Sequence, residues 1–257
     1  MDDHKGILEQ VFGQSSDSEV EDSTHGEDPS LPLSVQNPNP TCQPLHQIHG
    51  LWFCPDFLSP DQQSSLLSAV QNEGWFKDTS KNQTMRFGRL PAWAIELSHS
   101  IRELVYVSDS GFDLLDWGSS EGDRQASPFS PHLLWREPLF DQLIVNVYEP
   151  GEGICAHVDL LRFEDGIAIV SLESSCVMHF TRVETTADGI EDEGKSGSSP
   201  NRVPILLTPG SVVLMSGEAR YHWRHEINRK PGFQIWEGQE LDQMRRTSIT
   251  LRKLCLK

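Results

Sequence analysis

Long hydrophobic runs are missing from this sequence of 257 residues. No segment approaches the roughly eighteen consecutive apolar residues that a membrane-spanning helix requires, so we expect no membrane span. The N-terminus reads Met-Asp-Asp-His-Lys and has no basic start followed by an apolar stretch. We therefore expect no secretory signal either.

Closely paired cysteines are also missing. The five cysteines stand at positions 42, 54, 155, 176 and 255, and no two of them form a C-x-x-C pair. An odd and scattered set is not typical of a disulfide scaffold and indicates free thiols in a reducing compartment. We therefore expect the protein in the nucleus, the cytoplasm or both.

A basic excess is absent as well, since 21 Lys and Arg face 38 Asp and Glu and give a net charge of −17. This balance argues against a polynucleotide partner, whose phosphates need cationic contacts. The charge is uneven, however. Residues 1–45 carry −8, residues 184–195 carry −4, and residues 241–257 have five bases against one acid. Net charge therefore neither supports nor excludes a nucleic-acid partner.

The composition divides the chain into a tail and a folded part. Residues 1–45 are rich in Ser, Asp, Glu, Pro and Gln and have almost no aromatic residues. Such a segment cannot bury enough apolar area to offset its ordering entropy, so we predict a disordered acidic tail. Residues 46–257 are predicted to form one monomeric domain, in which the Gly-, Ser- and acid-rich residues 184–202 form a flexible loop insertion.

Two helices followed by eight short strands are predicted in the folded part. Ser59-Pro60-Asp61-Gln62 is a typical helix start, and apolar residues at helical spacing predict helices over residues 60–72 and 93–105. A long irregular connection is expected over 108–131. After it, short apolar runs between turn residues predict strands at 142–148, 154–158, 167–172, 175–181, 203–208, 211–216, 221–227 and 246–252. A mainly β fold with N-terminal helices follows, of the jelly-roll (double-stranded β-helix) type.

A candidate metal site begins at His157-Val158-Asp159. In a strand, residues i and i+2 share a face, so the imidazole and the carboxylate can point to one spot. His222 and His225 both lie in a later strand-like stretch, and either could supply a third ligand. Two histidines and one carboxylate are the ligand set of non-haem Fe(II) oxygenases. An H-x-D motif alone is weak evidence, because taken by itself it is more often explained by a surface or core histidine.

Two further strands carry polar side chains at alternate positions. Arg246-Thr247-Ser248-Ile249-Thr250-Leu251-Arg252 places two arginines on one face. This face is either an edge that meets water or a cationic wall inside the barrel that holds a dicarboxylate. Asn146 and Tyr148 share one face of an otherwise apolar strand, where they either bind a cosubstrate or form structural hydrogen bonds.

Together these residues resemble the AlkB-like family of Fe(II)- and 2-oxoglutarate-dependent dioxygenases. Five motifs stand in the family's order, within residues 50–257: 146–154, 157–159, 170–172, 216–225 and the pair Arg246 and Arg252. The run from Ser216 to His225 is similar to the eukaryotic branch that includes the tRNA wobble-uridine hydroxylase. Some DNA-repair members have an acidic residue two positions after the aspartate of the H-x-D motif. The segment after Asp159 lacks it, which argues against base repair on DNA.

The resemblance implies a role for each motif residue. His157, Asp159 and His225 would be the iron ligands, since His225 and not His222 holds the family's position two residues after the Trp. Arg246 would bind the distal carboxylate of 2-oxoglutarate. Asn146 and Tyr148 would help to bind the cosubstrate. Arg252 would line the inner pocket near the iron, and Arg86 and Phe87 would belong to a lid that grips the substrate.

The implied function is oxidation of a modified nucleobase with Fe(II), 2-oxoglutarate and O2, with RNA favoured over DNA. The nucleobase would be demethylated or stably hydroxylated, and a nucleic acid would be the partner. A protein or small-molecule hydroxylase on the same scaffold would use the same ligands and arginines. A non-catalytic jelly-roll binding module would be expected to lack a ligand or an arginine, whereas all five positions are filled here.

Overall fold

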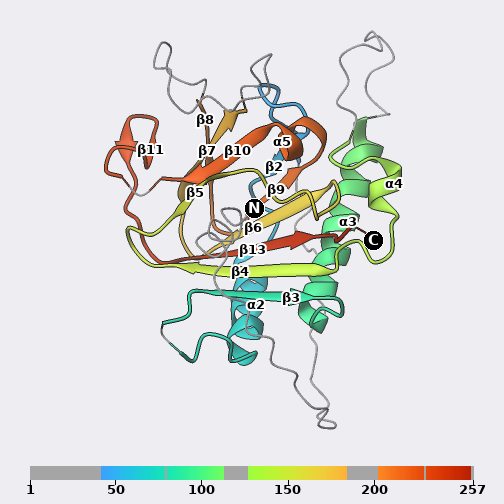
Figure 1. The fold of residues 1–257 in the computed structure, drawn as a ribbon, viewed down its shortest axis with the longest axis horizontal. Coiled ribbons are helices and arrows are strands. Elements are labelled where there is room, and N and C mark those ends of the chain that lie inside the picture. The colour runs from blue at the N-terminus through green and yellow to red at the C-terminus, as the bar shows by residue number, and fades with distance from the viewer. Residues whose placement is uncertain (1–41, 79, 113–126, 184–201, 229, 256–257) are drawn as a thin grey trace, which may run out of the picture. The chain divides into compact units, whose positions relative to one another are not determined.

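Two antiparallel sheets form the body of the computed structural model, which describes residues 42–78, 80–112, 127–183, 202–228 and 230–255 (Figure 1). The larger sheet contains, in spatial order, β1 (Gln43–Pro44), β2 (Leu51–Cys54), β9 (Val212–Met215), β6 (Ile167–Leu172), β13 (Arg246–Arg252), β4 (Gln142–Tyr148) and β3 (Gln83–Phe87). The smaller sheet contains β5 (Ile154–His157), β10 (Trp223–Ile227), β7 (Cys176–Arg182) and β8 (Arg202–Leu207). A short hairpin pairs β11 (Ile235–Trp236) with β12 (Gln239–Glu240).

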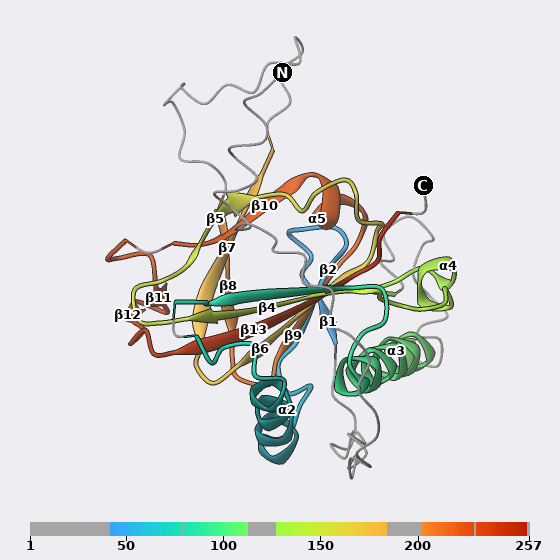
Figure 2. The same cartoon turned by 60° about the horizontal axis from the view of Figure 1, so that its bottom comes forward.

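Helices cover one face of the larger sheet. They are α2 (Pro60–Asn72), α3 (Ala92–Phe112) and the single turn α4 (Pro131–Leu134), and α5 (Gly217–Tyr221) precedes β10. Figure 2 shows α2 and α3 below the larger sheet, with the smaller sheet at the opposite side. Ser59 caps α2 as predicted, since its side chain and that of Gln62 form a capping box. No helix of the described segments is long and apolar enough to cross a membrane.

The larger sheet has a core on each face. The core beneath the helices includes Leu143, Val145, Ile249 and Leu251 together with Leu66 and Leu97. The core between the sheets includes Ile167, Ile169, Phe180 and Val213. A central strand of this sheet is covered on both faces, so most of its side chains are buried. This explains why β4 and β6 are nearly continuous hydrophobic runs.

The alternation predicted for the C-terminal strand is confirmed. Ile249 and Leu251 of β13 pack beneath the helices, so the residues of the other parity face the space between the sheets. Arg246 and Arg252 are buried there, with 3% and 2% of their surfaces exposed. The cationic wall inside the barrel is therefore the correct interpretation of this strand.

Two predicted boundaries were wrong. The second helix extends from Ala92 to Phe112, so the connection expected over 108–131 begins later and ends in α4. The strand expected at 221–227 begins only at Trp223, because residues 217–221 form α5 and the His222 N–H donates to the Glu218 carbonyl. Residues 83–87 form the edge strand β3, in the stretch 82–88 that the sequence indicates as a loop or hairpin.

The expectation of five free thiols was also wrong. Cys42 and Cys54 lie opposite each other where β1 pairs with β2, with Cα atoms 4.4 Å apart, and they form a disulfide. Cys155, Cys176 and Cys255 are free thiols. The folded part therefore begins before residue 46, while residues 1–41 and 184–201 of the predicted tail and loop lie outside the described residues.

Candidate active site

His157, Asp159 and His225 come together between the two sheets. His157 ends β5, and it lies directly opposite His225 of β10 in the strand register. Asp159 follows two residues later, and one ligand atom from each of the three residues lies within 4.8 Å of the others. Two imidazoles and one carboxylate in this arrangement are typical of a non-haem Fe(II) site. His222, the alternative third ligand, is exposed at the end of α5 and lies outside this cluster.

The hydrogen bonds around the triad leave donor atoms available for a metal. The Nδ1 atom of His157 lies 2.8 Å from the Cys155 carbonyl oxygen, which can only accept, so Nδ1 carries the proton and Nε2 is left as the ligand. One carboxylate oxygen of Asp159, Oδ2, is buried and has no hydrogen-bond partner among the described residues. It lies 3.8 Å from Nε2 of His225. A buried and unpaired carboxylate oxygen beside two imidazoles fits a bound cation.

The protonation states of the triad also suit a metal. Burial by itself would raise the pKa of Asp159, but the positive charge of Arg252, and then those of His225 and His157, lower it to about 2. Burial, and after it the charge of His157, lower the pKa of His225 to about 3. At neutral pH the carboxylate is therefore ionised and the His225 imidazole is neutral, which are the forms that bind metals.

Arg252 holds the carboxylate of Asp159 in place. Its Nη1 donates a short hydrogen bond to Asp159 Oδ1, and its Nε donates to Oε1 of Gln142 at 2.7 Å. The guanidinium lies 4.0 Å from the centre of the Phe163 ring. These contacts place Arg252 beside the triad.

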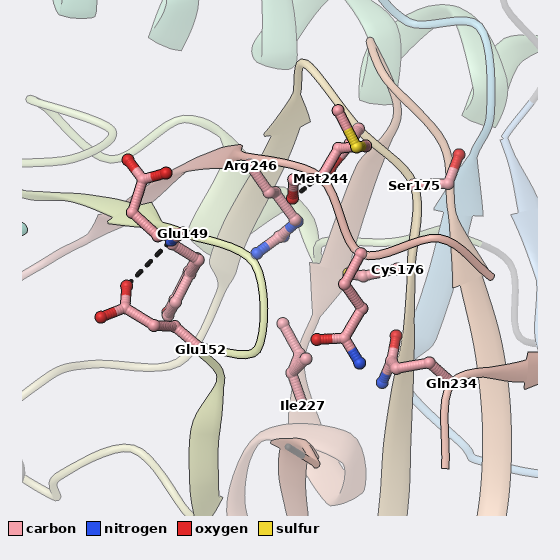
Figure 3. A pocket seen from close by; sticks show the side chains of 11 residues that line it. Glu149, Glu152, Ser175, Cys176, Ile227, Gln234, Met244 and Arg246 are labelled. Carbon is pink, nitrogen blue, oxygen red and sulfur yellow. Dashed lines mark hydrogen bonds between the residues drawn. The ribbon is translucent and has the colours of Figure 1, made fainter. Parts of the chain in front are cut away.

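Arg246 lies at the other end of β13, in a pocket that the triad does not line. Its Nε and Nη2 atoms donate to the Ser171 hydroxyl at 3.3 and 2.7 Å, whereas Nη1 is buried and has no hydrogen-bond partner in the described part of the chain. Figure 3 shows the Arg246 side chain extending into the pocket, above Ile227. Burial raises the pKa of the neighbouring Cys176 thiol, so this residue stays neutral and does not supply a counter-charge. A buried guanidinium with an unused N–H group fits the carboxylate of a ligand.

Asn146 and Tyr148 lie on the same strand but contact different parts of the structure. Tyr148 lies opposite Arg246 in the register of β4 and β13, lines the same pocket and places its ring 5.5 Å from the guanidinium. Asn146 lies two residues further along β4, opposite Ser248, and its Oδ1 accepts a hydrogen bond from Gln83 Nε2 at 2.7 Å. Tyr148 is therefore in place to contact the ligand of Arg246, and Asn146 ties β4 to β3.

The structure does not bring Arg86 and Phe87 to the same surface. Phe87 pairs with Gln142 and Arg86 pairs with Leu143, so Phe87 lies on the face of the active site and Arg86 lies on the face of the helices. The Arg86 guanidinium lies 4.6 Å from the Trp75 ring. Phe87 is 45% exposed, and the Arg162 guanidinium lies 5.3 Å from its ring.

Several residues of the site were missed in the sequence. Three of them are buried polar side chains. Gln142 binds Arg252, Ser171 binds Arg246, and Gln234 binds the backbone of Val177. Gln142 and Ser171 are polar residues at the ends of otherwise apolar strands, which is a usable signal. Gln234 comes from a segment without periodicity, so its position depends on tertiary contacts that no local pattern encodes.

Comparison with known proteins places this site in a family. A family model described as the 2OG-Fe(II) oxygenase superfamily matches residues 50–252. An Arabidopsis thaliana protein named alkylated DNA repair protein ALKBH8 homolog is 31% identical over 227 residues, which are 80% of this chain and 59% of that protein. A Macaca fascicularis protein named tRNA (carboxymethyluridine(34)-5-O)-methyltransferase ALKBH8 is 35% identical over 234 residues, which are 80% of this chain and 30% of that protein. The chain thus spans less than two thirds of the length of these relatives.

A solved structure shares the fold. The structure of OsALKBH1 superimposes with a TM-score of 0.53 at 14% sequence identity, and the match covers 82% of this chain and 99% of that chain. At this identity the likeness shows the shared architecture. It confirms the predicted jelly roll.

Proposed function

Because this chain belongs to the 2OG-Fe(II) oxygenase superfamily and is AlkB-like within it, we propose that it oxidises a modified nucleobase, in RNA in preference to DNA. The family uses Fe(II), 2-oxoglutarate and O2, and the chain is a dioxygenase. The substrate is the proposed part. The observation that carries it is an exposed aromatic ring, that of Phe87, which lies beside the cation of Arg162 and on the sheet face that also carries Arg252.

His157, Asp159 and His225 would hold the iron, because their ligand atoms meet in one place. When bound, the iron and 2-oxoglutarate supply an oxidant that attacks a C–H bond, while the cosubstrate is decarboxylated to succinate. Arg252 keeps the Asp159 carboxylate oriented through Oδ1 and leaves Oδ2 to face the metal. The chain's own contribution is therefore a preset ligand geometry.

Arg246 would bind the far carboxylate of the cosubstrate. Its Nε and Nη2 are fixed on Ser171, which holds the planar group in one orientation, and Nη1 remains for the ligand. Tyr148 completes this end of the pocket. A dicarboxylate held here is oriented before the reaction, which lowers the entropic cost of reaching the metal.

Phe87 offers a stacking surface for an unpaired base. It lies at the end of β3, opposite Gln142. Gln142 binds Arg252, and Arg252 binds Asp159. An exposed aromatic ring can stack on a base that has left its helix. The guanidinium of Arg162 adds a cation at the same place, where a phosphate group would pass.

The preference for RNA rests on relatives and on one loop. Two relatives over 80% of this chain carry ALKBH8 in their names, and one of them is named as a tRNA methyltransferase. The loop after Asp159, Leu160-Leu161-Arg162-Phe163, carries a cation and no acid. Both observations support a polynucleotide substrate with exposed bases over a duplex.

A substrate panel tests the proposal. Purified protein with Fe(II) and 2-oxoglutarate is incubated with bulk tRNA, methylated RNA and DNA oligonucleotides, histone peptides and a metabolite extract, and succinate is measured. We expect RNA to stimulate succinate release most strongly and the Phe87→Ala variant to lose that stimulation. Stimulation by peptides or metabolites alone would instead assign the chain to the protein or small-molecule hydroxylases.

A further inference from the structure

Arg220 is a buried arginine whose guanidinium binds only main-chain oxygens among the described residues. It is 1% exposed and lies on the short helix α5. Its Nη1 donates to the carbonyl of Asp159 at 2.8 Å. Its Nη2 donates to the carbonyls of Leu160 at 2.7 Å and Phe163 at 3.0 Å. Removing a guanidinium from water is costly, so three charge-assisted bonds to one turn indicate that the turn's conformation depends on this residue.

The bonded turn carries a residue of the metal triad. Strand β5 ends at His157, and Asp159 follows it with its own carbonyl on Arg220. Between Asp159 and Phe163 the ladder hydrogen bonds of β5 no longer fix the backbone. There the N–H of Phe163 donates to Leu160, and Phe163 forms an isolated bridge with Leu254. The turn is also tied to the C-terminal segment, where the Cys255 N–H donates to the Arg162 carbonyl at 2.9 Å. Among the described residues, however, the bond from Arg220 is the one that holds the Asp159 carbonyl.

The helix that carries Arg220 leads directly into the strand that carries another ligand. α5 ends at Tyr221, and β10 begins at Trp223 and brings His225 opposite His157. The start of α5 is tied to the same loop, because the Gly217 N–H donates to the Asp165 carboxylate at 3.0 Å. Arg220 thus connects the backbone of Asp159 with the segment that ends at His225.

We propose that Arg220 is a positioning residue for the metal triad, which sets the spacing between the Asp159 carboxylate and the His225 imidazole. The inference rests on the proposed metal site and adds a residue that touches neither metal nor cosubstrate. Residues that orient metal ligands through hydrogen bonds change metal affinity by about 10- to 100-fold when they are replaced. Arg220 acts in the same way through the backbone.

A second arginine provides a matched control. Arg136 also donates to main-chain carbonyls, those of Leu139 at 2.9 Å, Asp165 at 2.6 Å and Gly166 at 3.1 Å. Its side chain is 9% exposed. Its acceptors lie six or more residues from Asp159. Arg136→Lys therefore removes the same kind of bond from the same loop without touching the turn of the triad.

The test measures Mn(II) binding to the metal-free full chain, by the loss of the free-ion electron paramagnetic resonance signal, together with thermal unfolding of the metal-free protein. We expect Arg220→Lys to weaken Mn(II) binding by about 10- to 100-fold, because an ammonium group cannot reach all three carbonyls. We expect Arg136→Lys to stay within about threefold of the wild type. If Arg220→Lys does not fold, Arg220→Gln, which keeps two N–H donors, is measured in its place at a temperature where it is folded.

The outcomes separate the two claims. Unchanged Mn(II) affinity in a folded Arg220 variant overturns the positioning role, and so does an equal loss in Arg136→Lys. A cobalt(II) absorption spectrum that changes in the Arg220 variant and not in the Arg136 variant supports it, since that spectrum reports ligand geometry. If the Asp159→Ala variant binds Mn(II) as well as the wild type does, the triad is not the metal site, and the proposed function itself would fail.

Discussion

Arg246 gives the sharpest prediction for the cosubstrate. We expect Arg246→Lys to weaken 2-oxoglutarate binding by about ten- to a hundredfold. In the structure Arg246 is 3% exposed, two of its guanidinium nitrogens donate to the Ser171 hydroxyl, and Nη1 is left for a ligand. Lysine keeps the charge but has a single nitrogen, which must choose between Ser171 and the carboxylate.

The magnitude follows from the lost bond. A hydrogen bond to a charged group contributes about 1.5–3 kcal/mol, and about 1.4 kcal/mol corresponds to a tenfold change in affinity. Losing one such bond while keeping the charge gives the stated range. Replacing Arg246 with Met should cost more, because the charge is lost too and the carboxylate would be buried without a partner.

The assay is calorimetric titration of 2-oxoglutarate into Mn(II)-loaded protein. Arg245→Lys is the matched control, since Arg245 is the adjacent arginine but is half exposed and lies 3.8 and 3.9 Å from Glu149 and Glu173. We expect this control to bind 2-oxoglutarate within about twofold of the wild type. Unchanged affinity in a folded Arg246→Lys protein would refute the assignment, and a loss confined to Arg245→Lys would move the anchor to the neighbouring residue.

The remaining predictions concern the triad, the substrate surface, pH and the tail. Asp159→Ala should abolish metal binding and succinate formation while circular dichroism stays that of the wild type; retained turnover would contradict the ligand assignment. Phe87→Ala should weaken binding of single-stranded RNA by about 1–3 kcal/mol in a gel-shift or fluorescence titration, as expected for one lost stacking contact, and should leave 2-oxoglutarate affinity unchanged. Metal-free protein should lose about 2 kcal/mol of stability between pH 7.5 and pH 5 in urea unfolding, because the unfolded chain protonates His225 below about pH 6.5 while burial keeps the folded imidazole neutral down to about pH 3. This part of the pH dependence should disappear in His225→Gln. Deleting residues 1–41 should leave kcat and KM within about twofold, and a larger loss would show that the acidic tail contributes to catalysis.

Much of the fold followed from local patterns. The alternation in residues 246–252, the capping sequence at Ser59 and the apolar runs 142–148 and 167–172 each predicted an element whose bounds the structure reproduces. These patterns are readable because period-two burial and helix capping are short-range. The pair His157 and Asp159 was singled out for the same reason, since an H-x-D spacing on a strand implies a shared face, whereas the choice of His225 over His222 came from the family resemblance.

The rest depended on contacts between distant segments. The Cys42–Cys54 disulfide requires β1 to fold back on β2, and no C-x-x-C spacing announces it. Arg86 and Phe87 are neighbours in the sequence but lie on opposite faces of an edge strand, which only the pairing of β3 with β4 decides. Arg220 binds carbonyls some sixty residues away, a role that side-chain type alone does not reveal.

The measurement that tests the central claim most directly pairs two products of one reaction. Protein with Fe(II) and 2-oxoglutarate is incubated with tRNA in air, succinate is quantified, and the tRNA is digested so that its nucleosides can be compared by mass before and after. The proposed function predicts that succinate is accompanied by a matching amount of one demethylated or hydroxylated nucleoside, and that both are absent with Asp159→Ala. Succinate release that RNA and DNA leave unchanged and that a peptide or metabolite increases, with every nucleoside intact, would contradict it.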